Sequence, residues 1–194
     1  QKLEIDKLKL FLEKIGILDK IDFDIEEVGE PISFRWGKCK LATVSFGHGI
    51  TTTPLQLAKG YAIIANGGFA IKPSLIKKTL EHSQSHKRII KEGVSKQINE
   101  ILRKIVTTKE GTAGLANIKG YEVGGKTGTA EKAIVGGYTG KAKVNTFVSI
   151  FPTSKPKYVM VVLLDEPKTS EDYIYKYKNK SGSYKGTPFN TAGW

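Results

Sequence analysis

Three β-rich segments in the second half of the chain constrain its fold more than any other feature. They span 123–130, 144–151 and 158–165, and the first contains the run Gly-Gly-Lys-Thr-Gly-Thr-Ala. A glycine-containing connection joins the first two segments, and the short stretch 152–157 joins the last two. Strands this close in sequence pair with their neighbours in antiparallel sheets. The pattern therefore predicts an antiparallel meander.

Amphipathic helices are predicted ahead of this meander. Apolar residues recur with helical spacing over 8–15, where Gly16 can end the helix, and again at 94, 98, 101, 102 and 105. Two short strands, 69–71 and 75–80, and a polar loop over 81–91 are expected between them. Helices flanking an antiparallel sheet place the chain in the α/β class.

The segment that begins at Thr53 carries a helix-start signal. Thr53 is a good N-cap, Pro54 suits the first helical position, and Gln56 can close a capping box. The residues over 57–65 are apolar on most sides, and Asn66-Gly67-Gly68 is typical of a left-handed C-cap. We expect a buried helix here.

Length and composition predict one domain or most of one. The chain has 194 residues, 39% of them hydrophobic, which is enough for one sizeable core. We assign 1–194 to a single incomplete domain, with a mobile loop over 166–192 and no second domain. The first helix opens without a preceding turn or strand, so we expect the chain to be cut from something longer.

The net charge of +12 is carried mainly by lysine. Of 31 basic residues only Arg35, Arg88 and Arg103 are arginine, the residue that planar recognition of bases and phosphates favours. Basic residues and stacking aromatics interleave only over 173–184. We therefore expect no nucleic-acid partner.

The cysteine and histidines do not indicate a metal site or a cofactor. Cys39 is the single cysteine, expected to be structural or partly buried, and His48 is expected to be a packed or loop histidine. His82 and His86 are spaced for a shared metal, but serine and glutamine between them favour a loop. No run approaches the roughly 18 apolar residues of a membrane span, so any anchor is expected outside this chain.

The run from Gly120 to Thr127 allows two interpretations. It matches the phosphate-binding loop Gly-x4-Gly-Lys-Thr, which requires a strand before it and a helix after it. Here 115–119 is a poor strand, and β-type sequence follows Thr127. A P-loop nucleotide-binding domain therefore stays a remote alternative to a strand that carries Lys126, Thr127, Gly128 and Thr129.

The second interpretation resembles a known family. Lys126-Thr127-Gly128-Thr129 is similar to the third motif of penicillin-binding proteins, and the handful of segments that accompany it resemble class B members in order and spacing. These segments are Phe46-Gly47-His48-Gly49-Ile50, Thr53–Ala58, Ala65–Gly68 and Gly111-Thr112-Ala113. The resemblance covers roughly residues 34–165 and implies a transpeptidase-like fold.

The resemblance also implies roles for these residues. Lys126 would supply positive charge to the active site, Thr127, Gly128 and Thr129 would bind the substrate or β-lactam carboxylate, and the Thr129 N–H would form part of an oxyanion hole. The family also needs Ser-x-x-Lys and Ser-x-Asn. Ser74-x-x-Lys77 and Ser154-x-x-Lys157 match the first pattern but lie in extended or turn sequence, and Tyr177-x-Asn179 follows Lys126 instead of preceding it.

We therefore expect a fragment of a peptidoglycan D,D-transpeptidase that is inactive alone, with its nucleophile upstream. The resemblance implies a parent enzyme that cross-links stem peptides ending in D-Ala-D-Ala through an acyl-serine, binds β-lactams, and works with the cell-wall or division machinery. It also implies a membrane-anchored parent with a periplasmic catalytic domain. A β-lactamase or β-lactam sensor is the main alternative.

Overall fold

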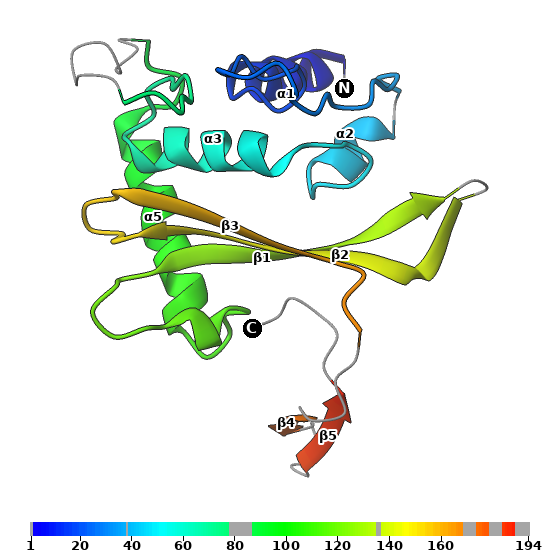
Figure 1. Ribbon diagram of the computed structural model, residues 1–194, viewed down its shortest axis with the longest axis vertical. Helices are drawn as coiled ribbons and strands as arrows, with labels where there is room; N and C mark the ends of the chain where they lie inside the picture. The colour runs from blue at the N-terminus through cyan, green and yellow to red at the C-terminus, as the bar shows by residue number, and fades with distance from the viewer. Residues whose placement is uncertain are drawn as a thin grey trace.

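The computed structural model describes residues 2–37, 39–77, 87–134, 137–168, 174–178 and 184–188. In these ranges the helices and strands, in chain order, are α1 (Lys2–Lys14), α2 (Lys40–Val44), α3 (Pro54–Ala65), α5 (Glu92–Thr107), the 3-10 turn η1 (Gly114–Ala116), β1 (Gly124–Ile134), β2 (Gly137–Phe151), β3 (Tyr158–Asp165), β4 (Ile174–Lys178) and β5 (Tyr184–Pro188). Figure 1 shows helices on one side of a twisted sheet.

The predicted meander is confirmed. β1, β2 and β3 form an antiparallel sheet in sequence order, and within the described residues β1 and β3 are its two edges. The strands run longer than expected between β1 and β2, where a bulge lies between Glu131 and Ala133. Alternation along the strands places Thr127 and Thr129 on one face and Lys126 on the other.

The face of β1 that carries Gly124 lies against α5. A Cβ atom at Gly124 would stand 3.0 Å from the backbone nitrogen of Arg103 in that helix. The β2 residues on the same face, Val148 and Ile150, are 4% and 0% exposed. Helix α3 packs against β2 and β3 and also contacts α5, so these two helices cover the sheet together (Figure 1).

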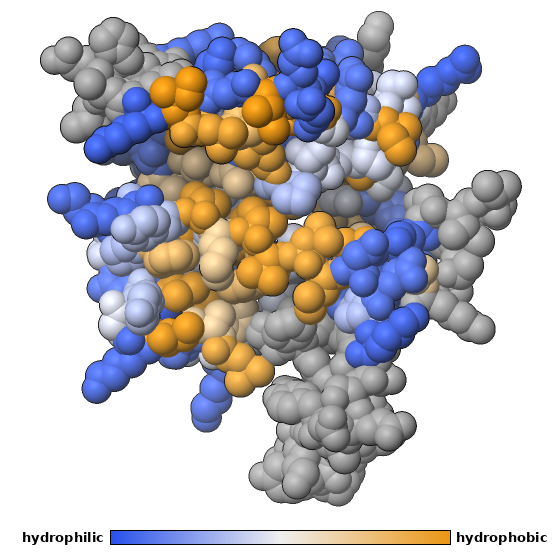
Figure 2. Space-filling view, viewed as in Figure 1, coloured by the Kyte–Doolittle hydropathy of each residue, from blue (hydrophilic) through white to orange (hydrophobic). Residues whose placement is uncertain are grey.

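The opposite face is apolar and open along β3. Its alternate residues on that strand are all exposed: Tyr158, Met160, Val162 and Leu164. Figure 2 shows apolar atoms gathered across the middle of the visible surface. Within the described residues, no strand pairs with the outer edge of β3.

Helix α5 is confirmed, but only part of its predicted apolar face is buried. Leu102 is buried as predicted, whereas Val94 and Ile101 are 42% and 55% exposed, and the other buried residues of the helix are Ser95, Asn99 and Val106. Ser95 Oγ donates a hydrogen bond to the carbonyl of Ile64 at 2.5 Å. Burying polar groups at the contact with α3 rotates the helix away from the orientation that its apolar pattern predicts.

Gln56 joins three segments at the base of α3 and is fully buried. Its Oε1 accepts from the Thr53 backbone N–H at 2.8 Å while the Thr53 side chain accepts from the Gln56 N–H, which confirms the capping box. Its Nε2 lies 3.2, 3.3 and 2.7 Å from the carbonyl oxygens of Gly16, Ile17 and Asp19. One side chain therefore starts α3 and fixes the chain leaving α1, beside a core of Ile15, Ile17, Ile63 and Ile90.

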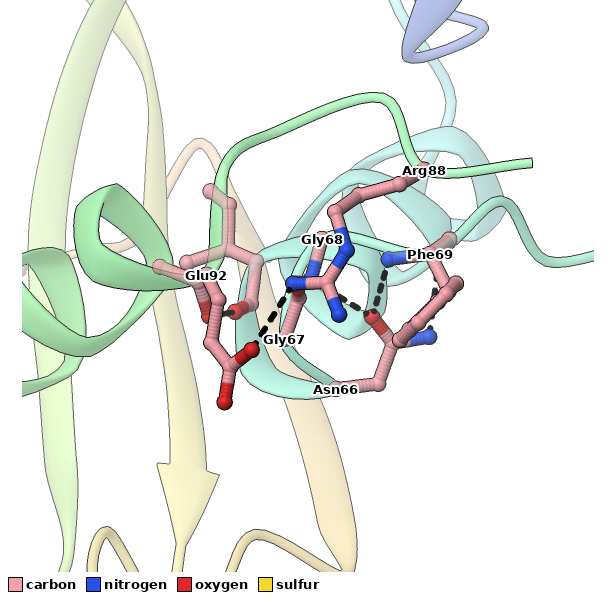
Figure 3. Close-up of polar contacts among 8 residues, drawn as sticks. Asn66, Gly67, Gly68, Phe69, Arg88 and Glu92 are labelled. Carbon is pink, nitrogen blue, oxygen red and sulfur yellow. Dashed lines mark hydrogen bonds and ion pairs between the residues drawn. The ribbon is translucent and has the colours of Figure 1, made fainter. Parts of the chain in front are cut away.

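The turn after α3 is held by side chains, and this explains why the predicted strands 69–71 and 75–80 are wrong over their described part. Asn66 Oδ1 accepts from the backbone N–H groups of Gly68 and Phe69, and Arg88 lies over the Phe69 ring (Figure 3). Arg88 also donates to the Gly67 carbonyl and pairs with Glu92. The carbonyl of Gly68 and the N–H of Ala70 bond to residues 87–90, and the N–H groups of Leu75 and Ile76 point at the Asp24 carboxylate, so only an isolated Phe69–Arg88 bridge forms.

Part of the stretch expected as a loop contains strands instead. Within 166–192, β4 and β5 pair in antiparallel register from Ile174↔Pro188 to Lys178↔Tyr184. Alternating tyrosines and lysines suit a two-stranded ribbon, a pattern that the irregular composition concealed.

No helix among the described residues has the length and apolar character needed to cross a membrane.

We predict that Gln56→Leu lowers the free energy of unfolding by about 2–4 kcal/mol, because it leaves buried backbone groups without partners. Urea unfolding followed by circular dichroism measures this change. Gln97→Leu, at an exposed position on α5, is the control and should change stability by less than about 0.5 kcal/mol. Equal effects of the two substitutions would contradict the assigned role of Gln56.

Candidate functional site

The Lys-Thr-Gly-Thr run lies on β1, along an edge of the sheet that is free within the described residues. Lys126, Gly128 and Thr129 are exposed and Thr127 is partly buried. The strand partners of Thr127 and Thr129 on β2 are Phe147 and Asn145. A strand edge offers unpaired backbone groups, so this run can present hydroxyls and amides to a ligand together.

Thr112 joins this site, although its sequence position indicated no role for it. Its hydroxyl oxygen lies 2.9 Å from that of Thr127, within hydrogen-bond distance. The two residues are 15 positions apart, Thr127 on β1 and Thr112 in the turn between α5 and η1. Only the motif resemblance of Gly111-Thr112-Ala113 pointed toward this segment. The hydrogen bond restricts the Thr127 side chain to a rotamer that faces Thr112.

A close backbone approach sets the position of Thr112. A Cβ atom at Gly111 would lie 1.9 Å from the carbonyl oxygen of Ile105, so no larger residue fits without a shift of the chain. The Gly111 N–H donates to the Thr108 carbonyl, and Ala113 is fully buried. Contacts with the end of α5 therefore fix the backbone at Gly111, and this places the Thr112 side chain within reach of Thr127 on β1.

The Lys126 ammonium folds back on its own strand. Its Nζ lies 2.5 Å from the carbonyl oxygen of Thr127. None of the ion pairs among the described residues involves Lys126, whereas Lys132 on the same strand pairs with Asp165 and Glu166, which raises the pKa of Lys132. Lys126 is thus the cation of β1 that can attract an anionic ligand.

The chain enters β1 through a fixed turn. Glu122 has a positive φ of 48°, and its carboxylate accepts hydrogen bonds from the hydroxyl and backbone N–H of Ser154. These two bonds are the main cause of the lowered pKa of Glu122. Arg103 donates to the Val123 carbonyl at 2.7 Å. Glu122 and Val123, which precede the Lys-Thr-Gly-Thr run, are therefore held by Ser154 and by Arg103 of α5.

The structure excludes a phosphate-binding loop at Gly120–Thr127. A 3-10 turn, not a strand, precedes this run, and the strand β1, not a helix, carries Lys126 and Thr127. The required strand, loop and helix are therefore not present in this order.

Neither serine of the Ser-x-x-Lys matches is placed to act as a nucleophile. Ser74 lies just before a bend at 75–76, where its hydroxyl is 2.6 Å from the Asp24 carboxylate, and Ser154 lies in a turn beside Glu122. The turn at Ser154 is the one that the sequence predicted, and Ser74 lies in neither a helix nor a strand. A lysine would have to lie one helical turn from the serine to activate it, and neither serine is in a helix.

The remaining predicted candidates have separate positions. Cys39 is exposed, so the expectation of a partly buried thiol was wrong: the residue stands just before the short helix α2 and points to no core. His48 lies in the loop just after the turn that ends that helix, as predicted, with its ring stacked on Phe46 at 6.2 Å. His82, His86 and Asn179 lie outside the described residues.

A lysine and three threonine hydroxyls at an open strand edge suit the binding of a carboxylate. The ammonium attracts the anion, and hydroxyl and backbone N–H groups can donate to its oxygens. Covalent chemistry would need a nucleophile that no described residue supplies at this edge.

Comparisons with known proteins agree with this geometry. The family described as penicillin binding protein transpeptidase domain matches residues 1–189. A probable peptidoglycan D,D-transpeptidase PenA of Neisseria flavescens is 34% identical over 140 residues, which cover 72% of this chain and 34% of that protein. The probable peptidoglycan D,D-transpeptidase FtsI of Caulobacter vibrioides is 30% identical over 97% of this chain and 31% of its own length.

Solved structures show the same similarity. The transpeptidase domain of penicillin-binding protein 3 from Burkholderia pseudomallei superposes with a TM-score of 0.77 at 26% identity, over 84% of this chain and 50% of that one. Penicillin-binding protein 3 of Mycobacterium tuberculosis, solved in complex with ampicillin, shares the fold with a TM-score of 0.77 at 24% identity. The chain spans about a third of the length of the curated relatives it matches.

We predict that Gly111→Ala destabilises the chain by about 2 kcal/mol or more, because the added methyl group would collide with the Ile105 carbonyl. Urea unfolding measures the loss. Gly114→Ala is the matched control, since a Cβ there meets nothing within 4 Å and should leave stability nearly unchanged. A tolerated alanine at 111 would show that the close approach does not position Thr112.

Proposed function

The chain belongs to the family of penicillin-binding protein transpeptidase domains, and from this we propose that it supplies the Lys-Thr-Gly-Thr wall of a peptidoglycan D,D-transpeptidase. The observation that carries the proposal is the edge of β1 that no other described strand covers. It carries Lys126, Thr127 and Thr129, and Thr127 lies within hydrogen-bond distance of Thr112. The relatives named as D,D-transpeptidases support the reaction class.

In this proposal the carboxylate of a stem peptide ending in D-Ala-D-Ala, or that of a β-lactam, binds to β1. Lys126 provides the positive charge, and Thr127 and Thr129 donate hydrogen bonds to the carboxylate. The backbone N–H of Thr129 contributes half of the oxyanion hole, an interaction that typically accounts for about 3 kcal/mol of transition-state stabilisation. Gly128 keeps this stretch of β1 free of a side chain, so that the ligand can lie against the backbone.

The acyl-enzyme would form on a serine in a part of the longer protein outside this chain. Ser74 and Ser154 are held by carboxylates in non-helical segments, which argues against either as the nucleophile. The serine hydroxyl would attack the carbonyl of the penultimate D-alanine and release the terminal D-alanine. An amine of a second stem peptide would then take the acyl group and restore the serine.

The proposed partners and location of the longer protein rest on the same family membership. We propose that the longer protein works with the cell-wall synthesis or division machinery and is anchored in the inner membrane with this domain in the periplasm. The FtsI name of one relative supports this assignment.

We predict that this chain alone gains no covalent mass from benzylpenicillin, whereas the same chain extended upstream by about one hundred residues gains one drug mass. Intact-mass spectrometry distinguishes the two. Acylation of this chain would contradict the proposed location of the nucleophile, and peptide mapping would then identify the serine. Rapid loss of the adduct from the extended protein would instead indicate a β-lactamase.

We further predict that Thr112→Val slows acylation of the extended protein about tenfold, which corresponds to the loss of one hydrogen bond of about 1.4 kcal/mol. Thr112→Ser keeps the hydroxyl and should retain most of the rate. Stopped-flow measurement with a fluorescent penicillin gives both values, and circular dichroism checks that each variant is folded. Equal rates for the valine and serine variants would mean that the contact with Thr127 does not assist binding.

A further inference from the structure

An open cavity lies beside α2, formed by residues other than the Lys-Thr-Gly-Thr run. It has a volume of about 450 Å³. The residues that line it come from 35–43 and from the turn after α2: Arg35, Gly37, Cys39, Lys40, Thr43, His48 and Gly49. None of these residues is acidic, and nothing in the proposed transpeptidase function uses them.

The Lys40 ammonium is fixed in position at this cavity. Its Nζ donates to the Gly49 carbonyl at 2.7 Å and lies 4.5 Å from the centre of the Phe34 ring. Gly49 has a φ of +78°, and a Cβ there would stand 2.8 Å from Nζ, so the glycine leaves the space that the ammonium occupies. An ammonium carries three donors, and only one is used by Gly49. The other N–H groups remain for a ligand.

Among the described residues, no ion pair neutralises the positive charge of this cavity. Other cations pair with carboxylates: Lys72 with Asp22, Arg88 with Glu92, and Lys132 with Asp165. In the described part of the chain, no ion pair involves Arg35 or Lys40. Two cations therefore share a hollow without an acidic neighbour in its lining.

We propose that this cavity is a binding site for an oxyanion of about two negative charges carried by a small organic molecule. Lys40 provides a fixed ammonium, and Arg35 adds a planar guanidinium that suits carboxylate or phosphate oxygens. The hollow is larger than a bare ion requires, which favours an anionic group on a larger body. Phosphate esters and dicarboxylates share this chemistry, and the experiment separates them.

Cys39 makes the proposal measurable, because it is the single cysteine of the chain, is exposed, and lines the cavity. The test compares its rates of modification by an anionic and a cationic methanethiosulfonate, each normalised to the rate with a small neutral thiol. We expect the anionic reagent to be favoured about tenfold at low salt, and the preference to disappear in about 1 M salt, where the screening length is about 3 Å.

Substitutions separate the cavity from the overall charge of the chain. Arg35→Gln should remove most of the preference, whereas Lys109→Gln, which deletes the same charge at an exposed position beyond α5, should keep it. Equal normalised rates for the two reagents, or equal effects of the two substitutions, would overturn the proposal.

Ligand protection completes the test. Inorganic phosphate and succinate are each titrated against modification of Cys39 by neutral methyl methanethiosulfonate. Protection by millimolar phosphate alone assigns a phosphate-bearing ligand, and protection by succinate alone assigns a dicarboxylate. In either case Arg35→Gln should raise the half-protecting concentration at least tenfold. No protection by either anion, or protection unchanged in Arg35→Gln, would refute the site.

Discussion

The closeness of α5 to the segments on either side of it controls the geometry of the site. Gly111 lies against the Ile105 carbonyl and Gly124 against the backbone at Arg103, at distances that leave no space for a Cβ atom. The first contact places Thr112, and the second places the start of β1. Because the Thr112–Thr127 hydrogen bond joins these two segments, the positions of the threonine hydroxyls follow from backbone packing and not from the threonines alone.

Polar side chains determine how these helices and turns pack, because apolar contacts alone would allow more than one arrangement. Ser95 binds the end of α3, Gln56 binds the segment that follows α1, and Asn66 organises the turn shown in Figure 3. Each of these side chains satisfies particular backbone groups and therefore selects one arrangement. Apolar residues such as Val94 and Ile101 would allow several rotations of α5, and these remain on its exposed side.

The same distinction explains what could be predicted from the sequence. Local signals were sufficient for the meander, for the capping box at Thr53 and for α5, because strand spacing and capping depend on neighbouring residues. The buried face of α5 and the absence of strands near Phe69 depend on contacts with α3 and Arg88, which no local pattern contains. Lys126 and Thr127 were selected as candidates through their motif, but the hydrogen bond of Thr127 with Thr112 could not be predicted, since it joins residues 15 positions apart.

The apolar face of β3, and its outer edge that no other described strand covers, have a practical consequence for the isolated chain. Every second residue of that eight-residue strand exposes a backbone donor and acceptor along the outer edge, and Tyr158, Met160, Val162 and Leu164 cover one face with uncharged side chains. Such a surface is a template for further strands. At high concentration the chain on its own is therefore prone to aggregate through β3, and a lysine introduced on that face would act as a gatekeeper against it.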